Sequence, residues 1–236
     1  NHGMEELLQT SGSSKNVILV GTGSEESVER SEVRLEAEAA AATAVAGLAD
    51  PLGNTAASGE IIYMAPLAIP GGQEKPSLLR GVTEKALLVH HRVRILEGSF
   101  PSSGEVMVGR LMHRRFGVPA EDFFPGRTLL FGRDEFRISG VFEASGTVLE
   151  SEAWFDRNDL ATITQRDSLS AVYLRLDEAE FDDAHVFTLQ RNDLELSAIG
   201  EDQYYDKLST FYAPIRVMIW ITAALVAAGA LFGGLN

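Results

Sequence analysis

VMIWITAALVAAGALFGGLN, residues 217–236, is the stretch around which the rest of this sequence is organised. None of its side chains is charged, and about 20 mostly apolar residues in a helix are enough to cross a bilayer core roughly 30 Å thick. A helix also satisfies its own backbone hydrogen bonds in lipid. We therefore expect a transmembrane helix. The alternative is a buried helix of a large soluble core, although such a helix is seldom apolar on every face over this length.

Aromatic and basic side chains stand at the N-terminal end of the expected span. Tyr212, Arg216 and Trp220 are of the kinds that favour the headgroup layer, so we predict that they mark the membrane boundary. Residues 201–216 are predicted to form a stalk helix that leads into the span. Because the sequence begins at Asn1 and stops without a charged flank, we expect a piece of a longer membrane protein with another span before residue 1.

The composition excludes several classes of partner and site. The net charge of −14 and the pI of about 4.8 argue against a nucleic-acid binder, which needs a basic face. They also argue against docking on anionic lipid. Lys and Arg are not concentrated before the expected span, which favours an extracytoplasmic location. The absence of cysteine excludes disulfides, thiolate metal sites and cysteine nucleophiles.

Strand and helix patterns alternate along the chain, and the middle is rich in short strands. The apolar run NVILV at 16–20 is typical of a buried strand, and the alanine- and glutamate-rich segment after it has high helix propensity. In the outer parts we expect strands at 16–20, 60–69, 171–176 (half-buried) and 194–199, and helices at 25–50, 158–164 (capped by Asp156 or Asn158), 177–190 and from 201 onward. In the middle we expect strands at 78–82, 93–96, 105–108, 128–131 and 136–142, and helices at 83–90 and 110–116.

These patterns predict an α+β protein with a discontinuous domain. A unit of βαβ elements is split by a small inserted α/β subdomain that is rich in strands. The predicted parts are an entry segment at 1–15, the discontinuous βαβ unit at 16–75 and 149–200, the insert at 76–148, the stalk at 201–216 and the span at 217–236.

Two long strings carry a recognisable progression of glycine and acidic residues. They are LRGVTEKALLVHHRVRILEGSFPSSGEVMVGRLMHRRFG at 79–117 and GRTLLFGRDEFRISGVFEASGTVLESEAWFDRNDL at 126–160. These strings resemble the periplasmic core domain of MacB/FtsX-like ABC transporter permeases. The resemblance covers nearly the whole chain, and Ser99 stands where the family usually has arginine.

The resemblance implies that the discontinuous unit at 16–75 and 149–200 is a porter-like subdomain, and it implies a function in transport. It implies the extracytoplasmic domain of an FtsX/MacB/LolC-type permease of the bacterial inner membrane, with residues 1–216 outside the membrane. This domain would transmit ATP-driven motion to substrate export or lipoprotein handling. The implied partners are a cytoplasmic ABC ATPase subunit, a second permease copy in a homo- or heterodimer, and a periplasmic adaptor or substrate lipoprotein.

No pattern in the sequence indicates catalysis or a cofactor. The phosphate-binding pattern GxxxxGK[ST] is absent, so we expect ATP hydrolysis on a separate subunit or domain and no enzyme here. His90, His91 and His113 lack the spacing of a zinc site, so we expect no metal. The alternative function is a membrane-anchored extracytoplasmic hydrolase or sensor, which would need a convergent polar pocket.

The densest acidic run lies between residues 150 and 159. Glu150, Glu152, Asp156 and Asp159 include pairs of carboxylates of the kind used in acid–base catalysis, but no EF-hand spacing is present. We expect a solvated loop with a helix cap.

Overall fold

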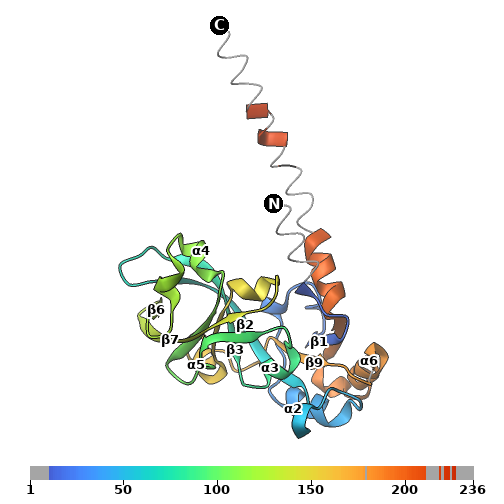
Figure 1. Ribbon diagram of the computed structural model, residues 1–236. Coiled ribbons are helices and arrows are strands. Elements are labelled where there is room, and N and C mark those ends of the chain that lie inside the picture. The colour runs from blue at the N-terminus through green and yellow to red at the C-terminus, as the bar shows by residue number, and fades with distance from the viewer. Residues whose placement is uncertain (1–10, 179, 211–217, 219–220, 224, 227–236) are drawn as a thin grey trace.

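The computed structural model describes residues 11–178, 180–210, 218, 221–223 and 225–226. Within these residues the protein has a mixed α+β fold in which ten strands join into one hydrogen-bonded sheet (Figure 1). The strands are β1 (Asn16–Gly21), β2 (Ala57–Ala68), β3 (Lys75–Val82), β4 (Arg94–Gly98), β5 (Glu105–Gly109), β6 (Thr128–Phe131), β7 (Asp134–Glu143), β8 (Ala153–Asp156), β9 (Ala171–Arg175) and β10 (Leu196–Gly200).

Short helices connect these strands. The α-helices are α2 (Glu36–Ala44), α3 (Ala86–Val89), α4 (Met112–Phe116), α5 (Arg157–Thr164) and α6 (Phe181–Gln190), and residues 201–210 are also helical. Single 3-10 turns are η1 (Val28–Arg30), η2 (Pro51–Gly53), η3 (Ala120–Phe123), η4 (Val148–Ser151) and η5 (Asn192–Leu194).

One part of the sheet has four strands in the order β10-β1-β9-β2, and each neighbouring pair is antiparallel. The helix α2 connects β1 to β2, and α6 connects β9 to β10, which is the split βαβ arrangement. Val17 and Leu19 of β1 belong to the same core cluster as side chains of α2 and α6. Ile18 and Val20 face the opposite cluster, with Tyr173. Burial on both faces explains why β1 is an unbroken apolar run.

The other part of the sheet closes on itself. The strands follow each other as β2-β3-β8-β5-β7-β6, and β6 pairs with β2 again, which makes a six-stranded barrel-like sheet. The β3–β8 and β5–β7 pairs are parallel. The strand β4 pairs with residues 140–143 of β7, and β6 pairs with residues 134–137 of the same strand. The barrel carries α4 and lies beside the four-stranded part, which carries α2 and α6 (Figure 1).

The long strand β2 belongs to both parts. Its residues 57–60 pair with β9, and its residues 61–67 pair with β3. The two parts therefore share one backbone and are not joined merely by a linker.

The predicted strands are largely confirmed, and β1 lies between β9 and β10. The prediction of a helix over 25–50 is wrong, because the observed α2 is much shorter. Val33, inside the predicted range, instead exchanges two backbone hydrogen bonds of 2.8 Å with Leu169. The strand β9 is buried on both faces and is not half-buried. The strand β8, at 153–156, was not predicted at all.

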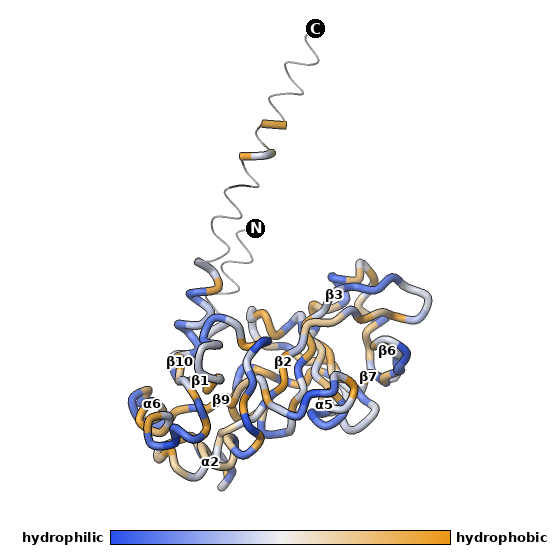
Figure 2. The backbone as a smooth tube through the Cα atoms, turned by 180° about the vertical axis from the view of Figure 1, so that it is seen from behind, coloured by the Kyte–Doolittle hydropathy of each residue, from blue (hydrophilic) through white to orange (hydrophobic). Residues whose placement is uncertain are grey.

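The C-terminal predictions are tested only in part. Residues 201–210 are helical as predicted, whereas most of the expected span at 217–236 lies outside the described residues. The apolar side chains described there, Met218, Ile221, Leu225 and Val226, are exposed. Figure 2 shows short hydrophobic pieces of backbone near the C-terminus. Among the residues that the structure describes, no helix combines the length and apolar character needed to cross a bilayer.

Two glycines allow a test of the barrel's packing. Gly98 at the end of β4 and Gly104 before β5 have similar left-handed φ angles of 75° and 78°. A Cβ on Gly98 would overlap the carbonyl oxygen of Ser139, whereas a Cβ on Gly104 would meet open space. Both changes to alanine cost left-handed strain, and only Gly98→Ala adds a backbone clash. We expect Gly98→Ala to lower the free energy of unfolding by about 1–3 kcal/mol more than Gly104→Ala in urea titrations. Equal losses would contradict this packing.

Candidate functional site

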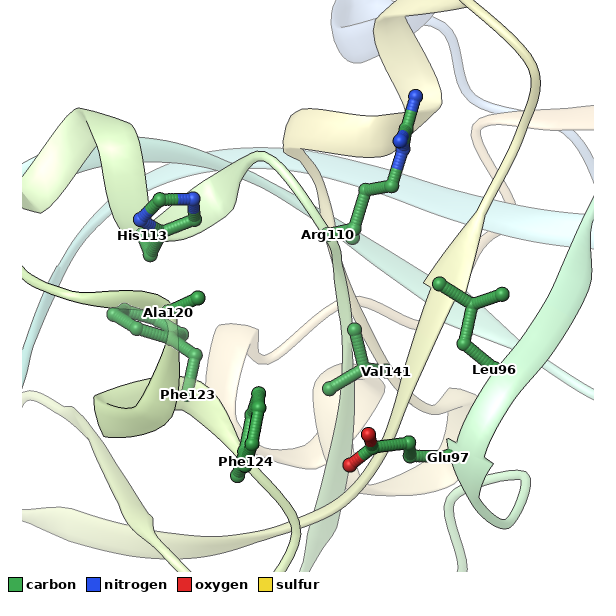
Figure 3. Close-up of a pocket in the computed structure, with 9 residues that line it drawn as sticks. Leu96, Glu97, Arg110, His113, Ala120, Phe123, Phe124 and Val141 are labelled. Carbon is green, nitrogen blue, oxygen red and sulfur yellow. The ribbon is translucent and has the colours of Figure 1, made fainter.

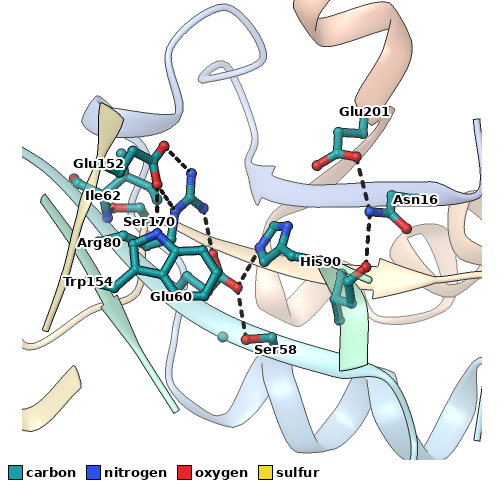
Figure 4. Close-up of polar contacts among 12 residues, drawn as sticks. Asn16, Ser58, Glu60, Ile62, Arg80, His90, Glu152, Trp154, Ser170 and Glu201 are labelled. Atoms are coloured by element: carbon teal, nitrogen blue, oxygen red, sulfur yellow. Dashed lines mark hydrogen bonds and ion pairs between the residues drawn. The ribbon is translucent and has the colours of Figure 1, made fainter. Parts of the chain in front are cut away.

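Buried charged side chains form a network where the four-stranded part meets the barrel (Figure 4). Arg80 of β3 lies between two carboxylates, Glu60 of β2 and Glu152 just before β8. Its Nη1 donates to Glu60 Oε2 at 2.6 Å, and its Nε and Nη2 donate to Glu152 at 2.6 and 2.8 Å. All three side chains are at most 3% exposed. The bidentate contact gives this pair a fixed geometry.

Strand register explains why these groups meet. Arg80 is aligned with Ile62 on one neighbouring strand and with Trp154 on the other. Glu60 and Glu152 each stand two residues before the aligned position. Because side chains two apart in a strand share a face, both carboxylates lie on the same face as Arg80.

Aromatic rings enclose the network. Trp154 Nε1 donates to Glu152 Oε2 at 2.9 Å. The guanidinium carbon of Arg80 lies 6.0 Å from the centre of the Trp154 ring and 5.5 Å from that of Tyr173. These distances suit cation–π attraction, which is stronger where water is excluded. Arg80 is therefore held by charge and by ring faces together.

His90, which directly follows α3, supplies the second cation. Its Nε2 lies 2.9 Å from Glu60 Oε1, and Ser58 Oγ donates to the same oxygen at 2.9 Å. Burial opposes ionisation of Glu60, but His90 and Arg80 together overcome it and lower its pKa to about 2. Burial likewise disfavours a charged His90, and the carboxylate of Glu60 outweighs this and raises the histidine pKa. With His90 protonated, two carboxylates balance two cations.

A second arm of polar contacts reaches the helical residues 201–210. Asn16 Nδ2 donates to Val89 O at 3.4 Å and to Glu201 Oε2 at 3.0 Å. The backbone N–H of Ser13 donates to the same Glu201 oxygen at 3.0 Å. Burial raises the pKa of Glu201. The polar contacts thus extend from the chain's entry segment to the start of its last described long helix.

A separate pocket of about 150 Å³ lies on the barrel beside α4 (Figure 3). It is smaller than typical ligand pockets of about 300–1,000 Å³. The side chain of Arg110 is directed away from it and pairs with Glu150 at 2.8 Å, while His113 Nδ1 lies 2.9 Å from Val118 O. Its lining is Leu96, Glu97, Gly109, Arg110, His113, Ala120, Phe123, Phe124 and Val141. The residues that line this pocket include no serine, threonine or cysteine nucleophile.

The predicted solvated loop at 150–159 is wrong, whereas the helix cap predicted there is confirmed. Glu150 and Glu152 are 1% exposed and ion-paired, because the unpredicted strand β8 draws this segment into the core. The predicted cap is confirmed, since Asp156 Oδ1 accepts from the N–H groups of Asn158 and Asp159 at 2.9 and 3.2 Å.

The predicted boundary residues Tyr212, Arg216 and Trp220 lie outside the described residues, so their role stays a prediction. No group of three His, Asp or Glu in the described ranges is placed to hold a metal ion. Sequence reasoning missed Glu60 and Arg80 as partners. The sequence feature that could have indicated this pair is a charged residue in each of two otherwise apolar strand patterns. These are Glu60 in EIIYM and Arg80 in LLRGV.

Comparison with known proteins gives a structural likeness only. No family model matches the sequence, and no curated protein matches it. The periplasmic region of MacB from Actinobacillus actinomycetemcomitans matches with a TM-score of 0.61 and 9% identity, over 88% of this chain and 98% of that one. The extracellular domain of the ABC-type transporter YknZ from Gram-positive bacteria matches with a TM-score of 0.58 and 14% identity, over 78% and 99%. A permease domain from Porphyromonas gingivalis gives 0.50 and 12%, over 78% and 87%.

Proposed function

We propose that this chain is the extracytoplasmic domain of a MacB/FtsX-like ABC transporter permease. The observation that carries the proposal is a fold shared over 88% of this chain and nearly the whole MacB periplasmic region. The match extends through both the four-stranded part and the barrel, so it is not a likeness of one common motif. The YknZ domain supports the same assignment.

The proposal includes partners and a place in the cell. The domain lies outside the bacterial inner membrane, anchored by a span at 217–236, and works with a cytoplasmic ABC ATPase and a second permease copy. A periplasmic adaptor or a substrate lipoprotein is its further partner. The porter-like unit is 16–75 with 149–200, and the insert is 76–148. The split βαβ topology of the first supports this division, although its boundary at 76 falls inside β3.

The mechanism we propose is transmission of motion. A helix rises about 1.5 Å per residue, so residues 201–210 span roughly 15 Å. A continuous helix transmits displacement, whereas a flexible coil absorbs it. The first turns of this helix are packed against the four-stranded part through Tyr204 and Tyr205, which are 7% exposed. Movement of the membrane-directed helix would therefore reach β1 and, through the shared strand β2, the barrel.

An insertion tests this function. Six Gly/Ser residues after Tyr212 in the full-length permease should abolish export, because the coil breaks the lever while leaving the folded domain and the ATPase intact. Export, ATP hydrolysis and the circular dichroism of the domain would be measured together. The same insertion between Gly71 and Gly72, in the exposed β2–β3 turn, serves as the control and should leave export unchanged. Undiminished export by the Tyr212 variant would contradict the lever, leaving a passive docking domain.

A further inference from the structure

Residues 11–12 contact the helix at 201–210, here called the exit helix, without any side chain between the two backbones. A Cβ on Gly12 would fall on the backbone of Asp202, so only glycine permits this approach. Ser11, the preceding residue, accepts a 2.9 Å hydrogen bond at its Oγ from the N–H of Val148. Residues 11–12 are thus held between the start of the 201–210 helix and the η4 turn.

A single carboxylate oxygen fastens this contact. Glu201 Oε2 accepts from Ser13 N and from Asn16 Nδ2, both at 3.0 Å. The side chain of Glu201 is almost fully buried, and a buried carboxylate is costly compared with an apolar side chain that would fill the same space. Hydrogen bonds to a charged group are stronger and more directional than apolar packing. A glutamate at position 201 therefore fixes the position of its hydrogen-bond partners, whereas an apolar side chain there would contribute more to the free energy of unfolding.

Asn16 is oriented by its neighbours. Val89 O and Glu201 Oε2 are both acceptors, so the amide must present its Nδ2 to them. Its Oδ1 is consequently buried without a hydrogen-bond partner among the described residues. A buried oxygen without a hydrogen bond lowers the stability of the folded state. Here the cost comes with the two hydrogen bonds of Asn16 Nδ2, which connect β1 to α3 and to the exit helix.

We propose that Gly12, Ser13, Asn16 and Glu201 form a joint that holds residues 11–15 and the exit helix rigidly against β1, and that Glu201 is its positioning residue. Residues 11–15 directly precede β1, and the exit helix directly follows β10. A displacement of either segment is therefore passed to the other through the joint as well as to the sheet. The joint itself stands on the contacts alone. Its role in export rests on the proposed function.

Hydrogen exchange in the 236-residue chain tests the joint. Glu201→Ala removes the acceptor of the Ser13 backbone amide and should speed its exchange by about tenfold or more. Exchange of the Asn16 backbone amide, which donates to Ser13 O, should rise with it because its acceptor is no longer held in place. Glu201→Gln keeps an acceptor oxygen and should stay within a few-fold of the wild type. Asp206→Ala, on an exposed position of the same helix, is the matched control and should change nothing at residues 11–16. Unchanged protection of β5 and β7 would show that Glu201→Ala remains folded.

Spin labels give a second readout, because the chain has no native cysteine. Cysteines placed at the exposed positions Ser14 and Lys207 should give a narrow distance distribution that broadens in Glu201→Ala and not in Glu201→Gln. An Ala variant with wild-type exchange and an equally narrow distribution would overturn the joint. So would a Gln variant that behaves like Ala.

The full-length permease separates this proposal from the broader one. Because the joint is broken in Glu201→Ala, the permease with this change should lose most of its export while ATP hydrolysis persists. The permease with Glu201→Gln should keep its export. Full export by Glu201→Ala, in spite of a broadened distance distribution between the spin labels, would overturn the role of the joint in coupling. The proposed function would still stand. Failure of the Gly/Ser insertion to affect export would count against the lever, whatever the labels show.

Discussion

Replacing Arg80 with methionine is expected to lower the free energy of unfolding by about 3–5 kcal/mol, because it leaves two buried carboxylates without their shared cation. Glu60 and Glu152 are both almost fully enclosed, so water cannot replace the lost contacts. Methionine fills much of the same volume, which keeps loss of packing small. Urea unfolding followed by circular dichroism measures the change.

Two controls make the Arg80 result specific. Arg137→Met removes an exposed arginine, 67% accessible and 3.5 Å from Glu105, and should cost only about 0–1 kcal/mol. The triple variant Glu60→Gln, Arg80→Met, Glu152→Gln removes the charges together and should recover much of the loss. If the triple variant is no more stable than Arg80→Met alone, unpaired charge is not the cause.

Acid is expected to destabilise the protein through Glu60. The folded-state pKa of this carboxyl is about 2, below the ordinary value of 4.5, so its contribution to stability is present above pH 4.5 and is lost as the pH falls towards 2. At about 1.4 kcal/mol per pKa unit the whole effect is on the order of 3 kcal/mol, of which about 2 appears between pH 4.5 and 3. Glu60→Gln should flatten this part of the stability profile. A Gln variant that loses as much as the wild type over the same range would contradict the assignment.

His90 and Glu201 act in the opposite direction. Both have pKa values raised by their surroundings, so the stability that each contributes is lost as pH rises, from 6.5 upward for His90 and from 4.5 upward for Glu201. The two carboxyl effects fall in different pH ranges, that of Glu201 above pH 4.5 and that of Glu60 below it, so the loss in acid below pH 4.5 is the part that Glu60→Gln should remove. His90→Gln should remove the alkaline slope. His91→Gln, at the neighbouring exposed position, should leave it in place.

Local patterns predicted most strands but not the contacts between them. An unbroken apolar run identified β1, and alternation around glycines identified the barrel strands, because both patterns are properties of consecutive residues. The helix over 25–50 was overestimated for the converse reason. Its alanine and glutamate favour helix locally, whereas the pairing of Val33 with Leu169 depends on residues far along the chain.

The buried network shows the same limit more sharply. Glu60, Arg80 and Glu152 are brought together by the register of three strands, and no local sequence pattern records that register. Glu152 was assigned to a solvated loop because four acidic residues in ten normally stay in water. The burial of Glu152 follows from Arg80, which lies 72 positions earlier.

The shared strand β2 also sets the order in which the chain can assemble. All six barrel strands lie between residues 57 and 156, so the barrel can close as soon as that stretch has been synthesised. Residues 57–60 of β2 then offer a free edge to β9 when it emerges. By contrast, the partners of β1 among the described residues are β9 and β10, so β1 must wait until about residue 175 has been synthesised. Among the described strands, the first to be synthesised is thus the one that waits longest for a partner, and during that delay its apolar sequence is exposed to aggregation.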